Sequence, residues 1–361
     1  MKIGLIYSRS LVSGSALRAS YIAKYLSKLG HDVEFIAPLK RMPFQLDFPL
    51  SLLVYTLKTI SKHYDVIYVI KPFPNACIPA LLKKYQNSNT KIILDVDDLD
   101  YAYRNGLVSY ISKFLQKPFP RYFDAITVHN DNLRKFLNEE LSIPIEKIFN
   151  LAQGVDLEVF NEKNVDKNLR KKLDLEDKHM IVYTGHLDVS TDLEPIFDAF
   201  EIVLERVEGC RLLIVGGGPR KRYFEKKVEK KGLKNNIIFT GYLDIALLPS
   251  YITLSDVCIV YYENRLANFY RSSMKLREYL AMKKHVVCND VGELKQFEEF
   301  TYQTTSDIED FADAIIDLLI SGGDKREFRG YEYVKQRYSW AKIIEEFEKN
   351  VLVPLIGDEN K

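Results

Sequence analysis

The sequence predicts an α/β protein built from two doubly wound, parallel-sheet domains, and three observations carry this prediction. The chain has 361 residues, which is long enough for two domains. Near its start a short apolar strand, a loop, a helical segment and a second strand follow one another over residues 2–37. A second series in the same order begins near Met180. Strands that alternate with helices in this way form parallel sheets.

The composition describes a globular protein without a bulk nucleic-acid partner. Hydrophobic residues make up 47% and charged residues 28% of the chain, and the net charge is only +1. A chain without a basic excess has no general attraction for phosphate backbones. The four cysteines share no short spacing, which excludes a zinc motif or a disulfide framework. We expect buried free thiols at Cys77, Cys210, Cys258 and Cys288.

The N-terminus and the hydropathy predict a cytoplasmic protein. Met1 leads directly into an apolar strand, and no signal-peptide pattern precedes it. No apolar run reaches the ~18 residues of a membrane-spanning helix. We therefore expect membrane contact only at the surface of the protein, at the inner face of the cell membrane.

The first half opens with a strand over Lys2–Tyr7, a loop over Ser8–Ser15, and a helix from about Ala16 to Leu29. Gly14 would let a ligand approach the backbone of this loop, although an ordinary turn explains it equally well. No GxGxxG sequence is present, so the dinucleotide fingerprint is absent. The next elements are a strand at Val33–Ala37, a helix at Pro49–Ile60, a strand at Asp65–Ile70, a helix at Ala76–Tyr85 and a strand at Lys91–Val96.

Two adjacent carboxylates, Asp97 and Asp98, follow the predicted central strand. The carboxyl ends of parallel strands open toward the ligand crevice, so these side chains could bind polar groups of a ligand. An acidic cap at a helix N-terminus is the alternative. Because no third ligand is evident, we predict no metal site.

Residues 101–123 are aromatic and basic, with Lys113, Lys117 and Arg121 among the rings. Together with the apolar segment 42–60, this composition favours an interfacial element or a binding site that contacts an anionic membrane. A packed helix with a basic solvent face remains the alternative.

The segment Phe269–Val287 organises the second half. Ser272 and Ser273 resemble a helix N-cap, and Met274–Met282 contains good helix formers. At helical spacing, Leu276, Tyr279 and Leu280 should face a core. The remaining elements of this half are strands at Met180–Gly185, Arg211–Val215, Ile237–Thr240 and Asp256–Tyr261, helices at Leu193–Val207 and Leu247–Leu254, and the strand HVVCND.

A second stripe of the predicted helix holds Arg271, Lys275 and Glu278. Two cations at a helix N-terminus oppose the macrodipole, whereas a bound phosphate would reverse the sign of this interaction. Glu278 lies one turn further along, at a distance where a carboxylate could accept both hydroxyls of a ribose. The alternative is a solvated face on which Lys275 pairs with Glu278.

This stretch resembles the donor-site helix of retaining glycosyltransferases of family 4, which have the GT-B fold. The family often shows Ser-x-x-Lys-x-x-Glu-Tyr-Leu-Ala before a strand, and here that pattern runs from Ser272 to Ala281. The fuller signature has two glutamates eight positions apart. Glu278 fills the second position, but Tyr270 occupies the first, which commonly contacts the transferred sugar.

Further motifs of the family recur along the chain. Gly217 and Gly218 belong to a sequence like its Val-Gly-x-Gly-Pro turn, and Tyr242 to the segment that lines the base. Two positions depart from the pattern, because His186 and Asp192 stand where relatives often have an arginine and a lysine on the diphosphate. Asp97 stands where many relatives have a histidine. The family's Asn-Gly-Val-Asp hinge is similar to residues 153–156.

The resemblance implies two Rossmann-like domains that face each other across a cleft: an acceptor-side domain over 1–160, a nucleotide-sugar domain over 161–338, and a C-terminal helix over 339–361 that crosses back. It implies transfer of a sugar from a nucleotide-diphosphate sugar to a saccharide or lipid-linked acceptor, with retention, in glycan or cell-surface polysaccharide synthesis, and without a metal cofactor. The implied catalytic residues are Arg271, Lys275 and Asp97; the implied donor-binding residues are Glu278, Ser272, Ser273, Gly217, Gly218, Tyr242 and His186; the implied sugar or acceptor residues are Gly14 and Asp98.

Two alternatives stay open at this point. One is a GT-B nucleotide-sugar epimerase, which would need further acid and base residues. The other is a non-catalytic partner subunit that keeps the fold, which Tyr270, His186 and Asp192 favour and Lys275 and Glu278 oppose.

Overall fold

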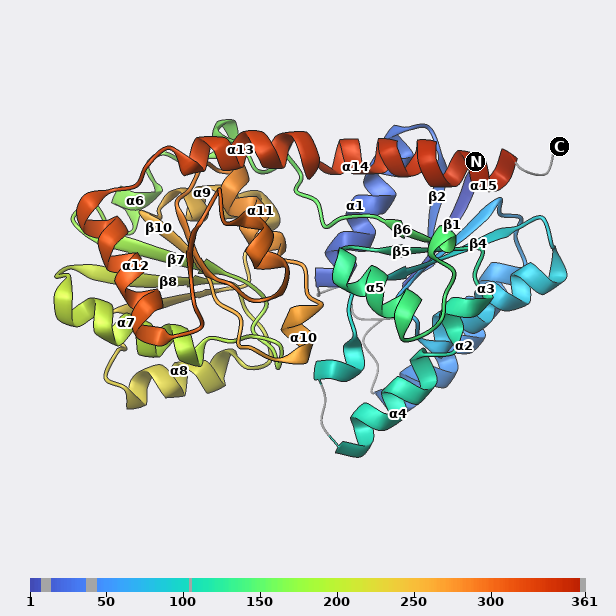
Figure 1. Ribbon diagram of the computed structural model, residues 1–361, viewed down its shortest axis with the longest axis horizontal. Coiled ribbons are helices and arrows are strands. Elements are labelled where there is room, and N and C mark those ends of the chain that lie inside the picture. Colours follow the sequence, from blue (N-terminus) through green and yellow to red (C-terminus); the bar gives the residue numbers. More distant parts are fainter. Residues whose placement is uncertain (8–13, 37–43, 104–105, 358–361) are drawn as a thin grey trace. The chain divides into compact units, whose positions relative to one another are not determined.

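The computed structural model describes residues 1–7, 14–36, 44–103 and 106–357, and it contains two six-stranded sheets (Figure 1). The strand pairs of both sheets are parallel. The chain divides into two compact units. Unit 1 comprises Met1–Gln153, Tyr270–Ser272 and Trp340–Lys361, and unit 2 comprises Gly154–Phe269 and Ser273–Ser339. The predicted α/β class with two doubly wound parallel sheets is confirmed.

The sheet of unit 1 has the order β2-β1-β3-β4-β5-β6. Because the chain adds β2 on one side of β1 and β3 on the other, the order reverses between β1 and β3. Ligands of doubly wound folds bind at such a switch point, outside the carboxyl ends of the strands. The strands are β1 Lys2–Tyr7, β2 Asp32–Ile36, β3 Val66–Ile70, β4 Lys91–Val96, β5 Ala125–Val128 and β6 Ile148–Asn150.

The helices of unit 1 include two that differ from prediction. α2 begins before Pro49, at Phe44, and the aromatic segment 101–123 divides into two short 3-10 helices around α4. The full set is α1 Gly14–Lys28, α2 Phe44–Ile60, α3 Pro74–Gln86, η1 Asp100–Tyr103, α4 Gly106–Gln116, η2 Phe119–Tyr122, α5 Asp131–Glu139, η3 Ile145–Lys147, α14 Trp340–Phe347, the π-helical η7 Glu348–Leu352 and α15 Val353–Gly357.

A buried ion pair and an aromatic stack hold α1 in unit 1. Arg18 is fully buried and makes two hydrogen bonds to Asp95 of β4, at 2.8 and 2.9 Å. Its guanidinium also donates to the carbonyl oxygen of Leu151, just after β6. Trp340 of α14 stacks on Tyr21 of α1 with ring centroids 5.6 Å apart. The C-terminal helix therefore packs directly on the first helix of the chain.

The sheet of unit 2 has the order β12-β11-β10-β7-β8-β9, so its strand order reverses between β7 and β10. The strands are β7 His179–Thr184, β8 Cys210–Val215, β9 Ile237–Gly241, β10 Val257–Val260, β11 Val286–Asn289 and β12 Tyr302–Thr304. The helices are η4 Glu162–Asn164, α6 Leu169–Lys172, α7 Glu194–Arg206, α8 Lys221–Lys230, η5 Ile245–Leu247, α9 Leu248–Thr253, α10 Leu266–Phe269, α11 Met274–Ala281, η6 Gly292–Phe297, α12 Ile308–Ser321 and α13 Arg326–Arg337.

Apolar side chains cover both faces of the second sheet. In β7, Ile181 packs in one core cluster with residues of α7, α8 and α12, whereas Met180 and Val182 pack in another with residues of α9, α11 and α13. This alternation is the period of two that places successive side chains on opposite faces of a strand. The four cysteines are buried and free, as predicted.

Hydropathy along the helices gives no membrane-crossing segment. Within the described ranges, every helix is too short or too polar to span a bilayer.

Candidate functional site

The helix α11 begins as its sequence predicts. Ser273 is the N-cap residue, and its hydroxyl accepts a hydrogen bond from the backbone N–H of Leu276. Leu276, Tyr279 and Leu280 are fully buried, which confirms that this stripe faces the core. The N-terminus of α11 follows β10 and α10 in the chain, so it lies on the β10 side of the switch point.

Lys275 and Glu278, on the second stripe of α11, are both buried, with exposures of 9% and 6%. The alternative of a solvated charged face is therefore wrong. The Lys275 ammonium donates a hydrogen bond of 2.8 Å to the phenol oxygen of Tyr183 in β7. It also lies 4.0 Å from the centroid of the Tyr183 ring, which is cation–π geometry. These contacts tie α11 to β7 across the switch point.

Burial shifts the protonation of Glu278. Loss of solvent raises the pKa of its carboxyl to about 7, while the nearby Lys275 ammonium acts in the opposite direction. Across the described part of the chain, no group donates a hydrogen bond to this carboxylate. A ligand that donates hydrogen bonds to such a buried, unsatisfied carboxylate would be bound more favourably.

A buried ion pair that was not predicted fixes α11 from its other side. Arg277 is fully buried, and its guanidinium lies 2.6 Å from Glu293. Arg277 also donates to the carbonyl oxygen of Ser273, and the N–H of Ser273 donates to Glu293. The N-cap of α11 is thus held by a charged pair whose members are sixteen residues apart in the sequence.

The glycines after β8 allow two loops to lie against each other. A Cβ atom on Gly216 would lie 2.0 Å from the carbonyl oxygen of Gly185, and one on Gly218 would lie 2.2 Å from that of Leu187. No side chain fits at these distances. Close packing of the loops after β7 and β8 therefore explains Gly216 and Gly218 without a ligand. The predicted donor contacts of Gly217 and Gly218 stay predictions.

Tyr242, which follows β9, presents an aromatic ring over the Gly217 backbone. A Cβ atom on Gly217 would lie 2.8 Å from that ring. The Tyr242 hydroxyl lies 3.0 Å from Nδ1 of His186, and the two rings lie 5.8 Å apart at a tilt of 32°. Tyr242 is 56% exposed, so a planar ligand can reach its ring.

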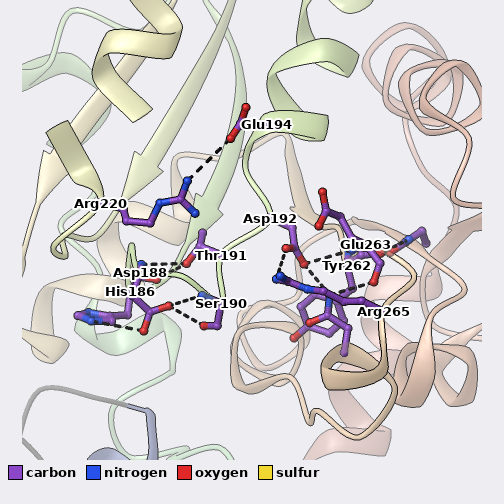
Figure 2. A network of polar contacts seen from close by, with 12 residues as sticks. His186, Asp188, Ser190, Thr191, Asp192, Glu194, Arg220, Tyr262, Glu263 and Arg265 are labelled. Atoms are coloured by element: carbon purple, nitrogen blue, oxygen red, sulfur yellow. Dashed lines mark hydrogen bonds and ion pairs between the residues drawn. The ribbon is translucent and has the colours of Figure 1, made fainter. Parts of the chain in front are cut away.

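Figure 2 shows the polar network that joins the loop after β7 to the loop after β10. Asp192 is buried and forms an ion pair with Arg265. Its carboxylate also accepts from Asn268 at 2.7 Å and from the N–H of Glu263 at 3.2 Å. The cation of this network, Arg265, was not predicted, although its side chain is one third exposed at the switch point.

The aspartates after β4 surround a buried lysine that was not predicted either. The Lys71 ammonium lies 3.1 Å from Asp97, 3.0 Å from Asp100 and 3.9 Å from Asp98. Lys71 directly follows β3 and has a positive φ of 71°. Its charge partly neutralises the three carboxylates at the carboxyl edge of the first sheet.

The two predicted aspartates differ in protonation. Burial alone would raise the pKa of Asp97, but Lys71 and a hydrogen bond from Ser15 outweigh it, so the pKa of Asp97 is lowered. Burial, together with the charges of Asp97 and Asp100, raises the pKa of Asp98 to about 7 against the opposing effect of Lys71. Asp98 can therefore exchange a proton near neutral pH, whereas Asp97 stays ionised.

The other predicted residues lie in unit 1. Arg271 and Ser272 are half-buried there, next to Tyr270, whose carbonyl oxygen accepts hydrogen bonds from His129 and Asn130. Because Lys275 belongs to unit 2, a joint approach of Arg271 and Lys275 to one phosphate stays a prediction. Gly14 is exposed as the first residue of α1, and the loop 8–13 before it lies outside the described residues.

The carboxylates, histidines and cysteines of the described ranges do not form a group of three placed to hold a metal ion.

Comparison with solved structures identifies the architecture. The chain superposes on sucrose-phosphate synthase from Thermosynechococcus elongatus with a TM-score of 0.82, over 99% of this chain and 100% of that one, at 17% identity. The fold is GT-B. Another GT-B structure, Anabaena HepE in complex with UDP-glucose, matches over 98% of this chain and 99% of that one, with a TM-score of 0.76 and 13% identity.

Sequence comparisons agree with the GT-B fold. Residues 178–321 match the family model described as Glycosyl transferases group 1. The alpha-D-kanosaminyltransferase of Streptomyces kanamyceticus is 21% identical over 192 residues, which cover 52% of this chain and 48% of that protein. The matches span about half to two thirds of the length of the first curated relatives.

Proposed function

We propose that this GT-B protein is a glycosyltransferase that moves a sugar from a nucleotide-diphosphate sugar to a saccharide or lipid-linked acceptor. The observation that carries the proposal is the buried pair Lys275 and Glu278 on α11, beside the switch point of the second sheet. The match of residues 178–321 to group 1 glycosyltransferases, which includes α11, supports it. So does the similarity to a structure that holds UDP-glucose.

The charge of Lys275 fits the leaving group of such a reaction. Departure of the sugar leaves negative charge on the diphosphate, and a fixed cation at low dielectric stabilises that charge strongly. Tyr183 holds the ammonium by a hydrogen bond and by its ring face, so little reorganisation is needed during the reaction. Arg271 is the second cation that we propose for this role.

The other contacts that we propose with the nucleotide sugar follow from the chemistry of each side chain. The Glu278 carboxylate would accept the ribose hydroxyls, which supply the donors that it lacks within the described chain. The exposed ring of Tyr242, oriented by His186, would stack on the base. Ser272 and Ser273 would contact the phosphate at the start of α11.

The sugar and acceptor residues that we propose are Asp97, Asp98 and Gly14 in unit 1. Asp98 titrates near neutral pH, which suits a group that accepts a proton from an acceptor hydroxyl. Retention of configuration rests on the resemblance of the Ser272–Ala281 motif to family 4. A role in glycan or cell-surface polysaccharide synthesis rests on the same resemblance. The proposal includes no metal cofactor.

Release of nucleotide diphosphate tests the proposal. The protein is incubated with UDP-, GDP- and ADP-sugars and a mixture of saccharide acceptors, and the free diphosphate is measured for wild type and Lys275→Met. We expect release with one class of donor and a large loss in the variant. Conversion of the donor sugar without release would assign an epimerase instead. Calorimetric binding of UDP, GDP or ADP without turnover would assign a non-catalytic subunit, and binding of none of them would contradict a donor site.

A further inference from the structure

The helix α4 of unit 1 has an inverted amphipathic pattern. Its residues Leu107, Tyr110, Ile111, Phe114 and Leu115 are between 43% and 73% exposed. They recur at intervals of three, one, three and one, which is the spacing of a single helical face. In an ordinary surface helix this face packs on the core. Here it points to solvent.

The described side chains on the face of α4 that packs inward are polar. Ser109 and Ser112 are half-buried and Gln116 is buried. The Ser109 hydroxyl donates a hydrogen bond of 2.8 Å to the carbonyl oxygen of Tyr101, which anchors the helix to η1. The polar side of α4 therefore faces the rest of unit 1, and Ser109 contributes a hydrogen bond there.

The charged residues within the segment 106–122 are all basic, and the carboxylate that acts on Lys117 from outside the segment is Glu140. Lys113 and Arg121 are exposed and Lys117 is half-buried, and no carboxylate occurs between residues 106 and 122. Burial and the neighbouring Lys113 lower the pKa of the Lys117 ammonium. A negatively charged partner would raise this pKa again and stabilise the charged form. Contiguous exposed apolar residues mark an interaction site, and an apolar face flanked by lysine and arginine complements an anionic lipid surface.

We propose that α4 is a membrane-binding element that inserts its apolar face into the interfacial region of an anionic bilayer. Leu107, Ile111 and Phe114 would enter the acyl boundary, while Lys113, Lys117 and Arg121 contact lipid headgroups. A second stripe in unit 1, formed by Leu50, Leu53 and Leu57 of α2, is also exposed at helical spacing. Membrane binding through α4 does not depend on the proposed transfer reaction.

Vesicle flotation tests this proposal with the full chain. The vesicles consist of phosphatidylcholine alone, or of phosphatidylcholine with about one third phosphatidylglycerol. Wild type should float with the anionic vesicles at low ionic strength and much less at high ionic strength. The partition coefficient of the variant Leu107→Ser/Ile111→Ser/Phe114→Ser onto anionic vesicles should be about tenfold or more lower than that of wild type. These three side chains supply most of the apolar area that the proposal buries in the bilayer.

A control variant carries three substitutions at similarly exposed residues away from α4, namely Tyr85→Ser, Ile320→Ser and Phe328→Ser. It should float like wild type. The variant Lys113→Gln/Arg121→Gln should lose the preference for anionic vesicles. Melting temperatures close to that of wild type would show that all variants are folded.

Three results would overturn the proposal. The first is wild-type protein that stays unbound with anionic vesicles at low ionic strength. The second is an α4 variant that floats as well as wild type. The third is a concentration-dependent dimer in light scattering that the α4 variant abolishes, because the apolar face would then belong to a second copy of the chain.

Discussion

The ammonium of Lys275 lies 2.8 Å from the hydroxyl of Tyr183 and 4.0 Å from the centroid of its ring, so one aromatic side chain positions this cation in two ways. The two residues are 92 positions apart in the sequence and lie on opposite sides of the strand-order reversal in the second sheet. A cation fixed at this place is available to an anionic ligand without a change of rotamer.

Lys275→Met should separate the charge of this residue from its packing. Methionine keeps an apolar stem but removes the ammonium. The loss of the cation–π contact, ~0.5–2 kcal/mol, is partly offset because a cation at a helix N-terminus costs ~0.3–1 kcal/mol. We expect a melting temperature near that of wild type and turnover that is lower by about 100-fold or more. Thermal unfolding and diphosphate release measure the two quantities.

Tyr183→Phe is the matched control for Lys275→Met, because it removes only the hydroxyl that accepts from Lys275. It should retain much more turnover, since the ring face still attracts the ammonium. Lys275→Met with intact turnover and a large loss of stability would instead make Lys275 a structural residue.

The raised pKa of Glu278 predicts a pH-dependent stability of the ligand-free protein. The folded carboxyl has a pKa of about 7 instead of 4.5, so the folded state binds more protons than the unfolded state between these values. Its contribution is complete below pH 4.5 and is lost as pH rises through about 7. At ~1.4 kcal/mol per pKa unit, the loss is roughly 3 kcal/mol. Denaturant unfolding of Glu278→Gln and wild type should show the variant gaining relative stability over this window, and a constant difference would contradict the shift.

Nucleotide-sugar binding should show the opposite dependence on pH. Ribose hydroxyls donate to an ionised Glu278 carboxylate, so ligand affinity should rise as pH increases through about 7. UDP-glucose is the suitable probe, because its diphosphate has no ionisation near neutral pH. Calorimetry should find a flat profile for Glu278→Gln, and Glu278→Ala should weaken binding by roughly 1–3 kcal/mol. Equal affinities for Glu278→Ala and wild type would exclude the ribose contact.

The sequence predicted the sheets well because their signal is local. Short apolar runs alternate with helical segments in both halves, and each run from Lys2 to Val96 became a strand within a few residues of its predicted position. The helices α12 and α13 were not predicted. The boundaries near Pro49 were wrong because proline usually marks a helix start, whereas α2 begins five residues earlier.

From the sequence, the candidate site could be predicted only for residues that share one helix. The spacing of Lys275 and Glu278 places them on one stripe, but a periodic pattern does not say what covers that stripe. Lys275 is in contact with Tyr183 of β7, which is 92 residues away in the sequence. The same limit applies to Asp97 and Asp98, whose partner Lys71 precedes them by more than twenty residues and has no local signature.

For α4, the sequence does not determine which face of the helix packs inward. Its aromatic and basic residues allowed either a packed helix with a basic solvent face or an interfacial element. The two alternatives differ only in which face is covered, and tertiary structure decides that. The burial of Gln116 and the exposure of Phe114 show that the apolar residues of α4 lie outside the core, while Lys113 and Arg121 are exposed as both alternatives require.

The pair of Asp192 and Arg265 predicts non-additive effects on stability. Asp192 is buried, and Arg265 is its only side-chain cation among the described residues. Arg265→Gln leaves a buried carboxylate without its counter-charge. For a fully buried pair this costs ~3–5 kcal/mol, and we expect about 2–3 kcal/mol because Arg265 is one third exposed. Asp192→Asn should cost less, because the freed guanidinium can be solvated.

The double variant Asp192→Asn/Arg265→Gln should lose less unfolding free energy than the two single variants lose together. The difference, which is the coupling energy of the pair, should be roughly 1 kcal/mol or more. Denaturant unfolding of the four proteins measures this coupling. Affinity for UDP-glucose adds a functional readout. If the cation that Asp192 holds at the switch point attracts the donor phosphates, Arg265→Gln should bind more weakly than Asp192→Asn at equal folded fraction. If the changes in unfolding free energy of the single variants add up to that of the double variant, the two side chains do not interact in solution. Stronger binding of UDP-glucose by Arg265→Gln than by Asp192→Asn would exclude a phosphate contact for Arg265.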